Sequence, residues 1–148
     1  MNFKRIYINS IHQILRAWWF LTRPESRGVK VILKFDDEVL LAQHSYGHRQ
    51  WTFPGGGVNS KEEYEAAARR EMKEELGIEI KNLKSIGSYF TNYEYKKVTV
   101  ECFVVEVDTK QVTTDNFEIA QVEWFKVNEL PIKRAPSVDK IMALYGNK

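Results

Sequence analysis

The sequence predicts an α/β (α+β) fold in which a mixed sheet is sandwiched between helices. Runs of β-branched and aliphatic residues precede and follow segment 60–76, whose composition favours a helix. A second, shorter helical pattern follows Pro136. The chain has 148 residues, which suits one domain with a substantial core. We therefore expect an N-terminal amphipathic helix at 1–24 and a single domain at 25–148.

The first half of the expected domain contains two strands, a loop and the longest helix. The two strands lie within 28–41 and flank a tight turn at Asp36-Asp37, and a shorter strand at 51–53 leads into a glycine-rich loop at 54–57. The helix at 60–76 is expected to begin with a capping box formed by Ser60 and Glu63 and to end at Gly77. The remaining expected elements are strands at about 83–90, 95–107 and 121–127 and a short helix near 137–145.

The N-terminal segment 6–21 carries apolar residues at helical spacing. Polar residues interrupt it too often for a signal peptide or a transmembrane segment. We expect it to pack against its own domain or against a second copy in a homodimer, with Trp18, Trp19 and Phe20 largely buried. The alternative is an anchor that lies on a membrane surface.

Charge and cysteine content exclude several classes of function. The net charge is +2, from 22 Lys and Arg against 20 Asp and Glu, so we expect no DNA-binding surface. The single cysteine, Cys102, excludes an internal disulfide and a cysteine-based zinc site. Cytoplasmic localisation is the expectation that fits this composition.

Three glutamates on the expected helix suggest a metal site. Glu71, Glu74 and Glu75 stand at i, i+3 and i+4, so their carboxylates emerge on one face of the helix. A glutamate-rich helix face is more often simply solvated. The glycine loop just before the helix changes this balance, because its backbone N–H groups and the helix N-terminus can approach a phosphate closely. Hard oxygen ligands beside such a loop suit Mg²⁺, with Mn²⁺ as a second possibility.

The spacing of these residues is similar to a complete Nudix box. The box reads Gly56, five residues, Glu62, seven residues, Arg70-Glu71-Met72, one residue, Glu74-Glu75, one residue, Gly77-Ile78. The resemblance extends over most of residues 28–130. It implies a Nudix-type α/β/α sandwich and hydrolysis of a phosphoanhydride bond in a nucleoside diphosphate linked to another moiety. It also implies dependence on a divalent metal ion.

The resemblance also implies a role for each residue of the box. Glu71, Glu74 and Glu75 would be metal ligands together with the backbone carbonyl of Gly56. Arg70 and Glu62 would form the scaffold that aims these carboxylates. The general base would be a box glutamate, Glu74 or Glu75, or an acidic residue on a distant loop. Our candidate for that residue is Glu118, just ahead of the last strand, and Glu101 and Glu123 are the alternatives.

The substrate is expected to be a small nucleotide, of the NTP or NDP-sugar/ADP-ribose-like type. Arg49 could contact a distal phosphate or sugar, and Tyr93 and Tyr95 could stack on a base. The alternative is a dinucleoside polyphosphate or RNA 5′-pyrophosphohydrolase. An alternative of another class is a non-catalytic Nudix-like module that binds a nucleotide without turnover. The intact box favours the hydrolase, because degenerate modules generally lose metal glutamates.

Overall fold

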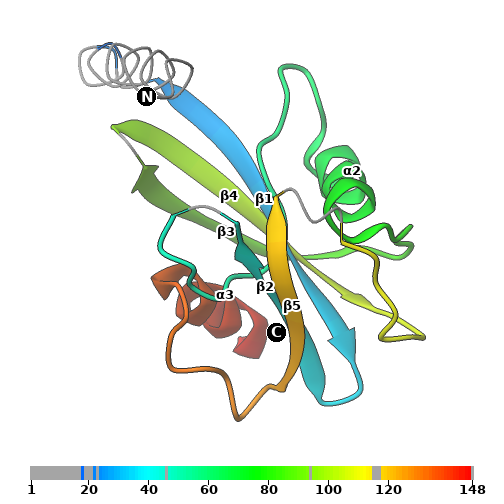
Figure 1. Cartoon of the computed structure of the whole chain (residues 1–148). Coiled ribbons are helices and arrows are strands. Elements are labelled where there is room, and N and C mark those ends of the chain that lie inside the picture. Colours follow the sequence, from blue (N-terminus) through cyan, green and yellow to red (C-terminus); the bar gives the residue numbers. More distant parts are fainter. Residues whose placement is uncertain are drawn as a thin grey trace, which may run out of the picture.

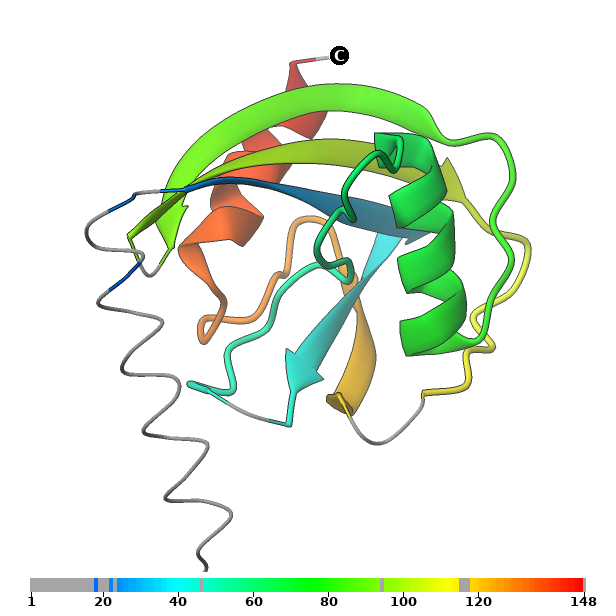
Figure 2. The same ribbon diagram turned by 90° about the horizontal axis from the view of Figure 1, so that it is seen from above.

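A five-stranded mixed sheet with helices on both faces forms the domain. The computed structural model describes residues 18, 22, 24–45, 47–93, 95–114 and 118–147, with only the backbone described at Tyr93. Helix α2 covers one face of the sheet and α3 covers the other, as predicted (Figures 1 and 2). The elements are β1 (Glu25–Phe35), β2 (Glu38–His44), α2 (Tyr64–Leu76), β3 (Lys84–Tyr93), β4 (Lys96–Glu106), β5 (Ile119–Lys126) and α3 (Pro136–Gly146).

The strand order is β3-β4-β1-β2-β5, and the central pair β1 and β4 runs parallel. All other neighbouring strands run antiparallel. Strands β1 and β2 pair only at Lys34 with Val39 and at Phe35 with Glu38, beside the turn that joins them. Beyond these pairs the two strands separate, and residues 51–57 fill the space between them through bridges to both strands.

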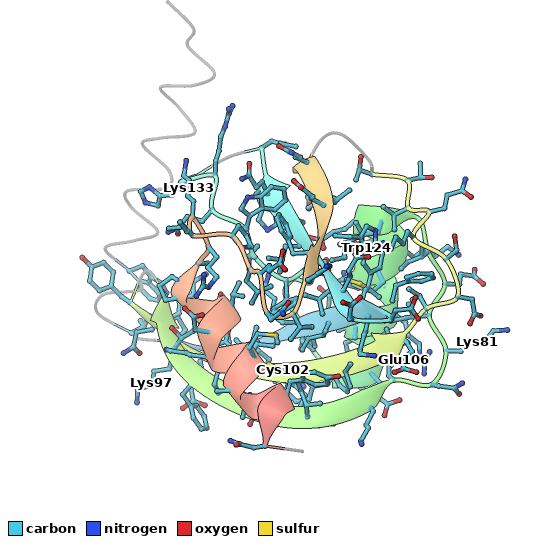
Figure 3. The ribbon with its side chains drawn as sticks, turned by 90° about the horizontal axis from the view of Figure 1, so that it is seen from below. Lys81, Lys97, Cys102, Glu106, Trp124 and Lys133 are labelled. Atoms are coloured by element: carbon cyan, nitrogen blue, oxygen red, sulfur yellow. The ribbon has the colours of Figure 1, made fainter. Side chains whose placement is uncertain are left out.

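The core has two halves, one on each face of the sheet. Alternation along β1 sends Val29, Val31 and Leu33 toward α2, where they pack against Ala68 and Met72. On the other face of the sheet, buried residues pack against α3. They include Ile32, Leu41, Phe53 and Cys102, and α3 contributes Val138 and Ile141. Figure 3 shows Cys102 on the α3 side, and the cysteine is buried and forms no disulfide.

Helix α2 begins at Tyr64, four residues later than predicted, and the capping box of Ser60 and Glu63 is wrong. Glu63 is the N-cap residue, but its side chain makes no capping hydrogen bond. Residues 59–62 instead form a turn in which the carboxylate of Glu62 accepts the Asn59 N–H at 2.8 Å. Lys61 has φ of +66°, which is incompatible with a helix. The predicted end is correct, since Gly77 caps the helix in the left-handed conformation with φ of +64°.

Little of the N-terminal segment lies within the described residues. Trp18 and Thr22 have helical backbone, and the Thr22 hydroxyl donates to the Trp18 carbonyl at 2.9 Å. Trp18 is 62% exposed, so the expected burial of Trp18 is wrong for the single chain. Trp19 and Phe20 lie outside the described residues, and packing on a second copy stays a prediction. Across the residues that the structure describes, none of the helices has the length and apolar character needed to cross a bilayer.

The packing of the glycine-rich loop at 54–57 against β1 predicts that two glycine substitutions in this loop differ sharply in their effect on stability. Gly55 has φ of +129°, and a Cβ there would lie 2.3 Å from the Val29 carbonyl oxygen. Gly55→Ala should therefore lower the free energy of unfolding by about 2–5 kcal/mol, through backbone strain and overpacking. A Cβ at Gly57 would meet no atom within 4 Å, so Gly57→Ala should cost less than about 1 kcal/mol. Urea unfolding of both variants measures the difference, and equal costs would contradict the close packing of the loop on β1.

Candidate functional site

The glycine loop is held against β1 by alternate carbonyl groups. The Pro54 carbonyl accepts the Val31 N–H at 3.0 Å, and the Gly56 carbonyl accepts the Val29 N–H at 2.9 Å. In the opposite direction, the Gly55 N–H donates to the carboxylate of Glu75 at 2.8 Å. Glu75 is only 3% exposed. The loop therefore joins the open edge of β1 to the buried side of α2.

Glu71 lies directly against Gly56. A Cβ added at Gly56 would be 2.7 Å from the carboxyl carbon and from both carboxyl oxygens of Glu71. Any other residue at this position would push the carboxylate of Glu71 away from where it now lies, so glycine allows the present position of Glu71. Among the residues that the structure describes, Glu71 and Glu75 are the two buried charged residues, at 8% and 3% exposure, and both carboxylates face the loop.

Arg70 ties the charged residues of the box into one network. Its guanidinium makes a bidentate pair with Glu62, with Nε to Oε1 at 2.9 Å and Nη2 to Oε2 at 3.0 Å. Nη2 also donates to the Gly57 carbonyl at 2.8 Å, and Nη1 donates to Glu71 at 2.6 Å and to Glu74 at 3.2 Å. The hydrogen bonds that Arg70 donates to Glu62 lower the pKa of Glu62 to about 2. The geometry agrees with the scaffold role expected for Arg70 and Glu62.

Lys30 belongs to this site and was missed in the sequence. Its ammonium donates to the Phe53 carbonyl at 2.8 Å and to the Gly55 carbonyl at 3.2 Å. Burial lowers the pKa of Lys30, and the negative charges of Glu75 and Glu71 oppose that shift. The sequence signal that could have identified Lys30 is a charged residue placed between Val29 and Val31, inside an aliphatic run.

The pKa values of both buried glutamates are raised, by burial and by nearby negative charge. Burial raises the pKa of Glu75 to about 7, although Lys30 and the Gly55 N–H act in the opposite direction. Burial also raises the pKa of Glu71 despite its hydrogen bond from Arg70. The charge of Glu118 adds to both shifts. A bound cation would relieve this repulsion.

The donor atoms fit a divalent cation, although the carboxylates do not meet at one point. Among the described residues, no three His, Cys, Asp or Glu side chains are grouped closely enough to form a ready metal site. Glu71 and Glu74 instead share Arg70, Glu75 accepts the Gly55 N–H, and the Glu74 side chain is 60% exposed. The two buried carboxylates and the glycine carbonyls nevertheless supply the hard oxygen atoms that Mg²⁺ and Mn²⁺ prefer. The chemistry of the site therefore fits the expected metal ion.

The candidate base lies near the buried glutamates. Glu118 is exposed just before β5, and its carbonyl accepts the Ser45 N–H at 2.9 Å, which fixes it beside the end of β2. Its charge raises the pKa values of Glu71 and Glu75, which is consistent with a place at the same site. Of the alternatives, Glu101 accepts a hydrogen bond from Ser85, and Glu123 is exposed on β5.

The expected substrate residues lie on loops and turns around the sheet. Arg49 is exposed in the segment after β2, with φ of +47°. Tyr95 is 47% exposed in the turn between β3 and β4, with φ of +69°. That turn belongs to the far edge of the sheet, beyond β4 from β1. Tyr93 ends β3, and its side chain is outside the described part of the structure. Tyr95 thus lies on a different connection from the glycine loop and the glutamates of α2, and its role in substrate binding stays a prediction.

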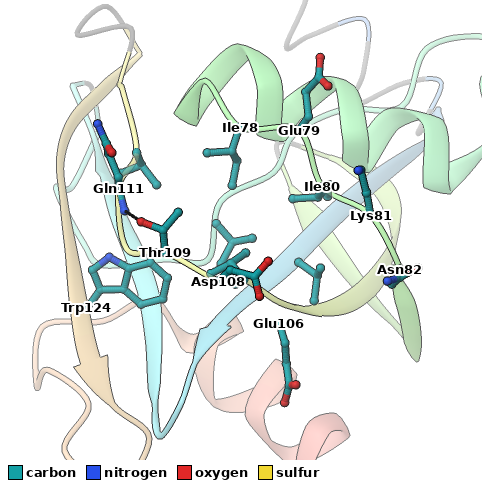
Figure 4. Close-up of a pocket in the computed structure, with 14 residues that line it drawn as sticks. Ile78, Glu79, Ile80, Lys81, Asn82, Glu106, Asp108, Thr109, Gln111 and Trp124 are labelled. Atoms are coloured by element: carbon teal, nitrogen blue, oxygen red, sulfur yellow. Dashed lines mark hydrogen bonds between the residues drawn. The ribbon is translucent and has the colours of Figure 1, made fainter.

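A separate cavity of about 480 Å³ lies at the C-terminal end of α2 (Figure 4). Its wall is apolar at Ile78, Ile80 and Trp124, while Glu79 and Lys81 lie at its polar side. None of the predicted site residues lines this cavity. The candidate site is therefore the region around the glycine loop and the glutamates of α2.

The raised pKa of Glu75 predicts a pH-dependent stability difference in the presence of EDTA. The folded protein holds the Glu75 proton up to about pH 7, against 4.5 for the ordinary side chain. Stabilisation by this proton is complete below pH 4.5 and is lost as the pH rises through about 7. Glu75→Gln mimics the protonated form, so it should gain on the order of 3 kcal/mol over wild type between pH 4.5 and 8. Urea unfolding at both pH values tests this, and exposed Glu65→Gln is the control. A difference that does not change with pH would refute it.

Comparison with known proteins identifies the family. The NUDIX domain profile matches residues 24–145. The NAD-capped RNA hydrolase NudC of Escherichia coli is 32% identical over 108 residues, which make up 72% of this chain and 41% of that protein. The chain thus spans less than half the length of the curated relatives it matches.

Solved structures show the same fold. The MutT NUDIX hydrolase from Burkholderia pseudomallei superposes with a TM-score of 0.73 at 20% identity, covering 82% of this chain and 96% of that one. An Ap4A hydrolase from C. elegans gives a TM-score of 0.71 at 21% identity, with coverage of 82% and 96%. Together with the family profile and the complete box, these matches confirm the prediction from the sequence: the chain belongs to the Nudix family.

Proposed function

We propose that the chain is a divalent-metal-dependent hydrolase that cuts a phosphoanhydride bond in a nucleoside diphosphate linked to another group. The observation that carries this proposal is the network around the glycine loop. Arg70 joins Glu62, Glu71 and Glu74, while Glu75 holds the Gly55 N–H. A domain that only binds nucleotides would not need two buried carboxylates with raised pKa values beside the loop.

The cation in this proposal is Mg²⁺, with Mn²⁺ able to replace it. Glu71, Glu74 and Glu75 would hold it together with a glycine carbonyl. The Gly56 carbonyl keeps one lone pair beyond its hydrogen bond from Val29, and the Gly55 carbonyl is a second candidate. When bound, such an ion neutralises phosphate charge and lowers the pKa of a water molecule.

The chain's own residues would orient the reactants and move a proton. Arg70 fixes Glu71 and Glu74 by charge-assisted hydrogen bonds, and Glu62 fixes Arg70. Glu118, Glu74 or Glu75 would take the proton from the attacking water. Glu118 has the advantage that its exposed carboxylate lies outside the buried pair and so can reach solvent.

The substrate we propose is a small nucleotide of the NTP or NDP-sugar/ADP-ribose-like type, bound with help from Arg49, Tyr93 and Tyr95. The near-neutral charge of +2 supports it over a long nucleic acid. The alternative, a dinucleoside polyphosphate or an RNA 5′ end, is favoured by the relative described as an NAD-capped RNA hydrolase. We further propose that the protein acts in the cytoplasm and that segment 6–21 contributes to a homodimer.

Metal dependence and the glutamates of α2 can be tested together. Hydrolysis of a nucleoside diphosphate derivative should require Mg²⁺ or Mn²⁺ and stop in EDTA. Glu71→Gln and Glu75→Gln should each lower kcat by about 100-fold or more, because each deletes a ligand charge while keeping side-chain size. Glu65→Gln, on the exposed first turn of the same helix, should leave kcat unchanged. Full activity in EDTA would rule out the metal mechanism, and nucleotide binding without any turnover would favour the binding module.

A substrate screen tests the class of nucleotide. NTPs, ADP-ribose, NDP-sugars, dinucleoside polyphosphates and capped or triphosphorylated RNA should be ranked by kcat/KM with Mg²⁺. We expect an NTP or an NDP-sugar type to lead. If a dinucleoside polyphosphate or RNA leads by tenfold, which is about 1.4 kcal/mol of transition-state preference, the small-nucleotide proposal is wrong.

A further inference from the structure

Lys30 completes an unusual arrangement of four successive carbonyl groups in the loop. The carbonyls of Pro54 and Gly56 receive backbone N–H groups of β1. The carbonyls of Phe53 and Gly55 point away from those donors, and both receive the ammonium of Lys30. One strand therefore satisfies all four carbonyls, two through its backbone and two through a single side chain.

The charge of the buried glutamates also acts on the same side chain. Among the charges that act on Lys30, Glu75 has the largest effect and Glu71 the next largest. Gly55 links the two groups directly, since its N–H donates to Glu75 while its carbonyl accepts from Lys30. The ammonium therefore uses the two kinds of group that a divalent cation needs here, a glycine carbonyl oxygen and the negative charge of α2.

We propose that Lys30 is an internal competitor of the divalent cation, which must compete with the Lys30 ammonium for the Gly55 carbonyl and for the charge of Glu75. This inference rests on the metal site of the proposed function. Because of this competition, the site binds a divalent cation more weakly than it would without the Lys30 ammonium. Lys30 also stabilises the metal-free protein, because it partners groups that would otherwise be buried without a donor.

Two substitutions on the same strand separate this role from a general effect of charge. Lys30→Met keeps the length of the side chain and removes the ammonium. Lys34→Met is the matched control, since Lys34 lies on the same face of β1 but pairs with Glu106 at 3.1 Å, near the turn into β2. Should Lys30→Met not fold, Lys30→Gln keeps an N–H donor without the charge and takes its place.

The decisive measurement is Mn²⁺ binding without nucleotide, followed by the electron paramagnetic resonance signal of free Mn²⁺. Lys30→Met should bind Mn²⁺ at least about tenfold more tightly than wild type, whereas Lys34→Met should stay within about twofold of wild type. Thermal unfolding gives a second readout that does not depend on activity. In EDTA, Lys30→Met should have a lower Tm than wild type, and saturating Mn²⁺ should narrow that gap.

Each outcome decides between competition and its alternatives. Unchanged Mn²⁺ affinity in Lys30→Met would overturn the proposal, and weaker affinity would show that Lys30 only holds the loop in place. If Lys34→Met bound Mn²⁺ as much more tightly as Lys30→Met does, the effect would come from net charge alone, and the proposal would be overturned as well. If wild type and both variants all fail to bind Mn²⁺, the metal site of the proposed function is wrong too. Binding in wild type without tightening in Lys30→Met rejects the competitor alone.

Discussion

The structure depends on how the open edge of β1 is hydrogen-bonded. Because β1 and β2 separate after two residue pairs, the N–H groups of Val29 and Val31 have no partner in a neighbouring strand. Buried backbone groups must be satisfied, and the loop at 54–56 supplies the missing carbonyls. This close approach to β1 leaves no room for a Cβ at Gly55. The hydrogen bonds that the backbone of β1 requires thus hold the glycine-rich loop in a fixed position beside α2.

That position brings α2 and the loop into electrostatic contact. Glu75 is used to hold the Gly55 N–H, and Glu71 fills the space beside Gly56. Burying carboxylates is unfavourable unless they are paired, and the raised pKa values of both side chains reflect the incomplete compensation. Arg70 hydrogen-bonds to Glu71, and the positive charge of Lys30 opposes the raised pKa of Glu75. The site therefore gives up stability to keep negative charge beside the loop.

The sequence predicted the features that depend on local pattern or on an established motif. The strands of the sheet and the end of α2 at Gly77 follow from residue patterning and from glycine at a left-handed position. The start of α2 did not, because Ser60 and Glu63 satisfy a local capping pattern. A longer-range bond from Arg70 instead holds Glu62 in a turn. Lys30 was missed for the same reason, since its partners lie more than twenty residues away. Interactions between segments distant in the sequence determine the start of α2 and the role of Lys30, and local sequence patterns do not predict such interactions.

In the proposed function, the chemistry shared by the family and the choice of substrate would reside on different parts of this fold. The loop, Arg70 and the glutamates of α2 are bound to one another and to β1, so a change at any of them disturbs the others. Arg49 and Tyr95 are instead exposed, in segments that join strands, and each has positive φ. Such positions can change without disturbing the core or the network around Arg70. In the proposed function, the rigid part would act on the diphosphate common to many nucleotides, while the connecting segments would select the group attached to it.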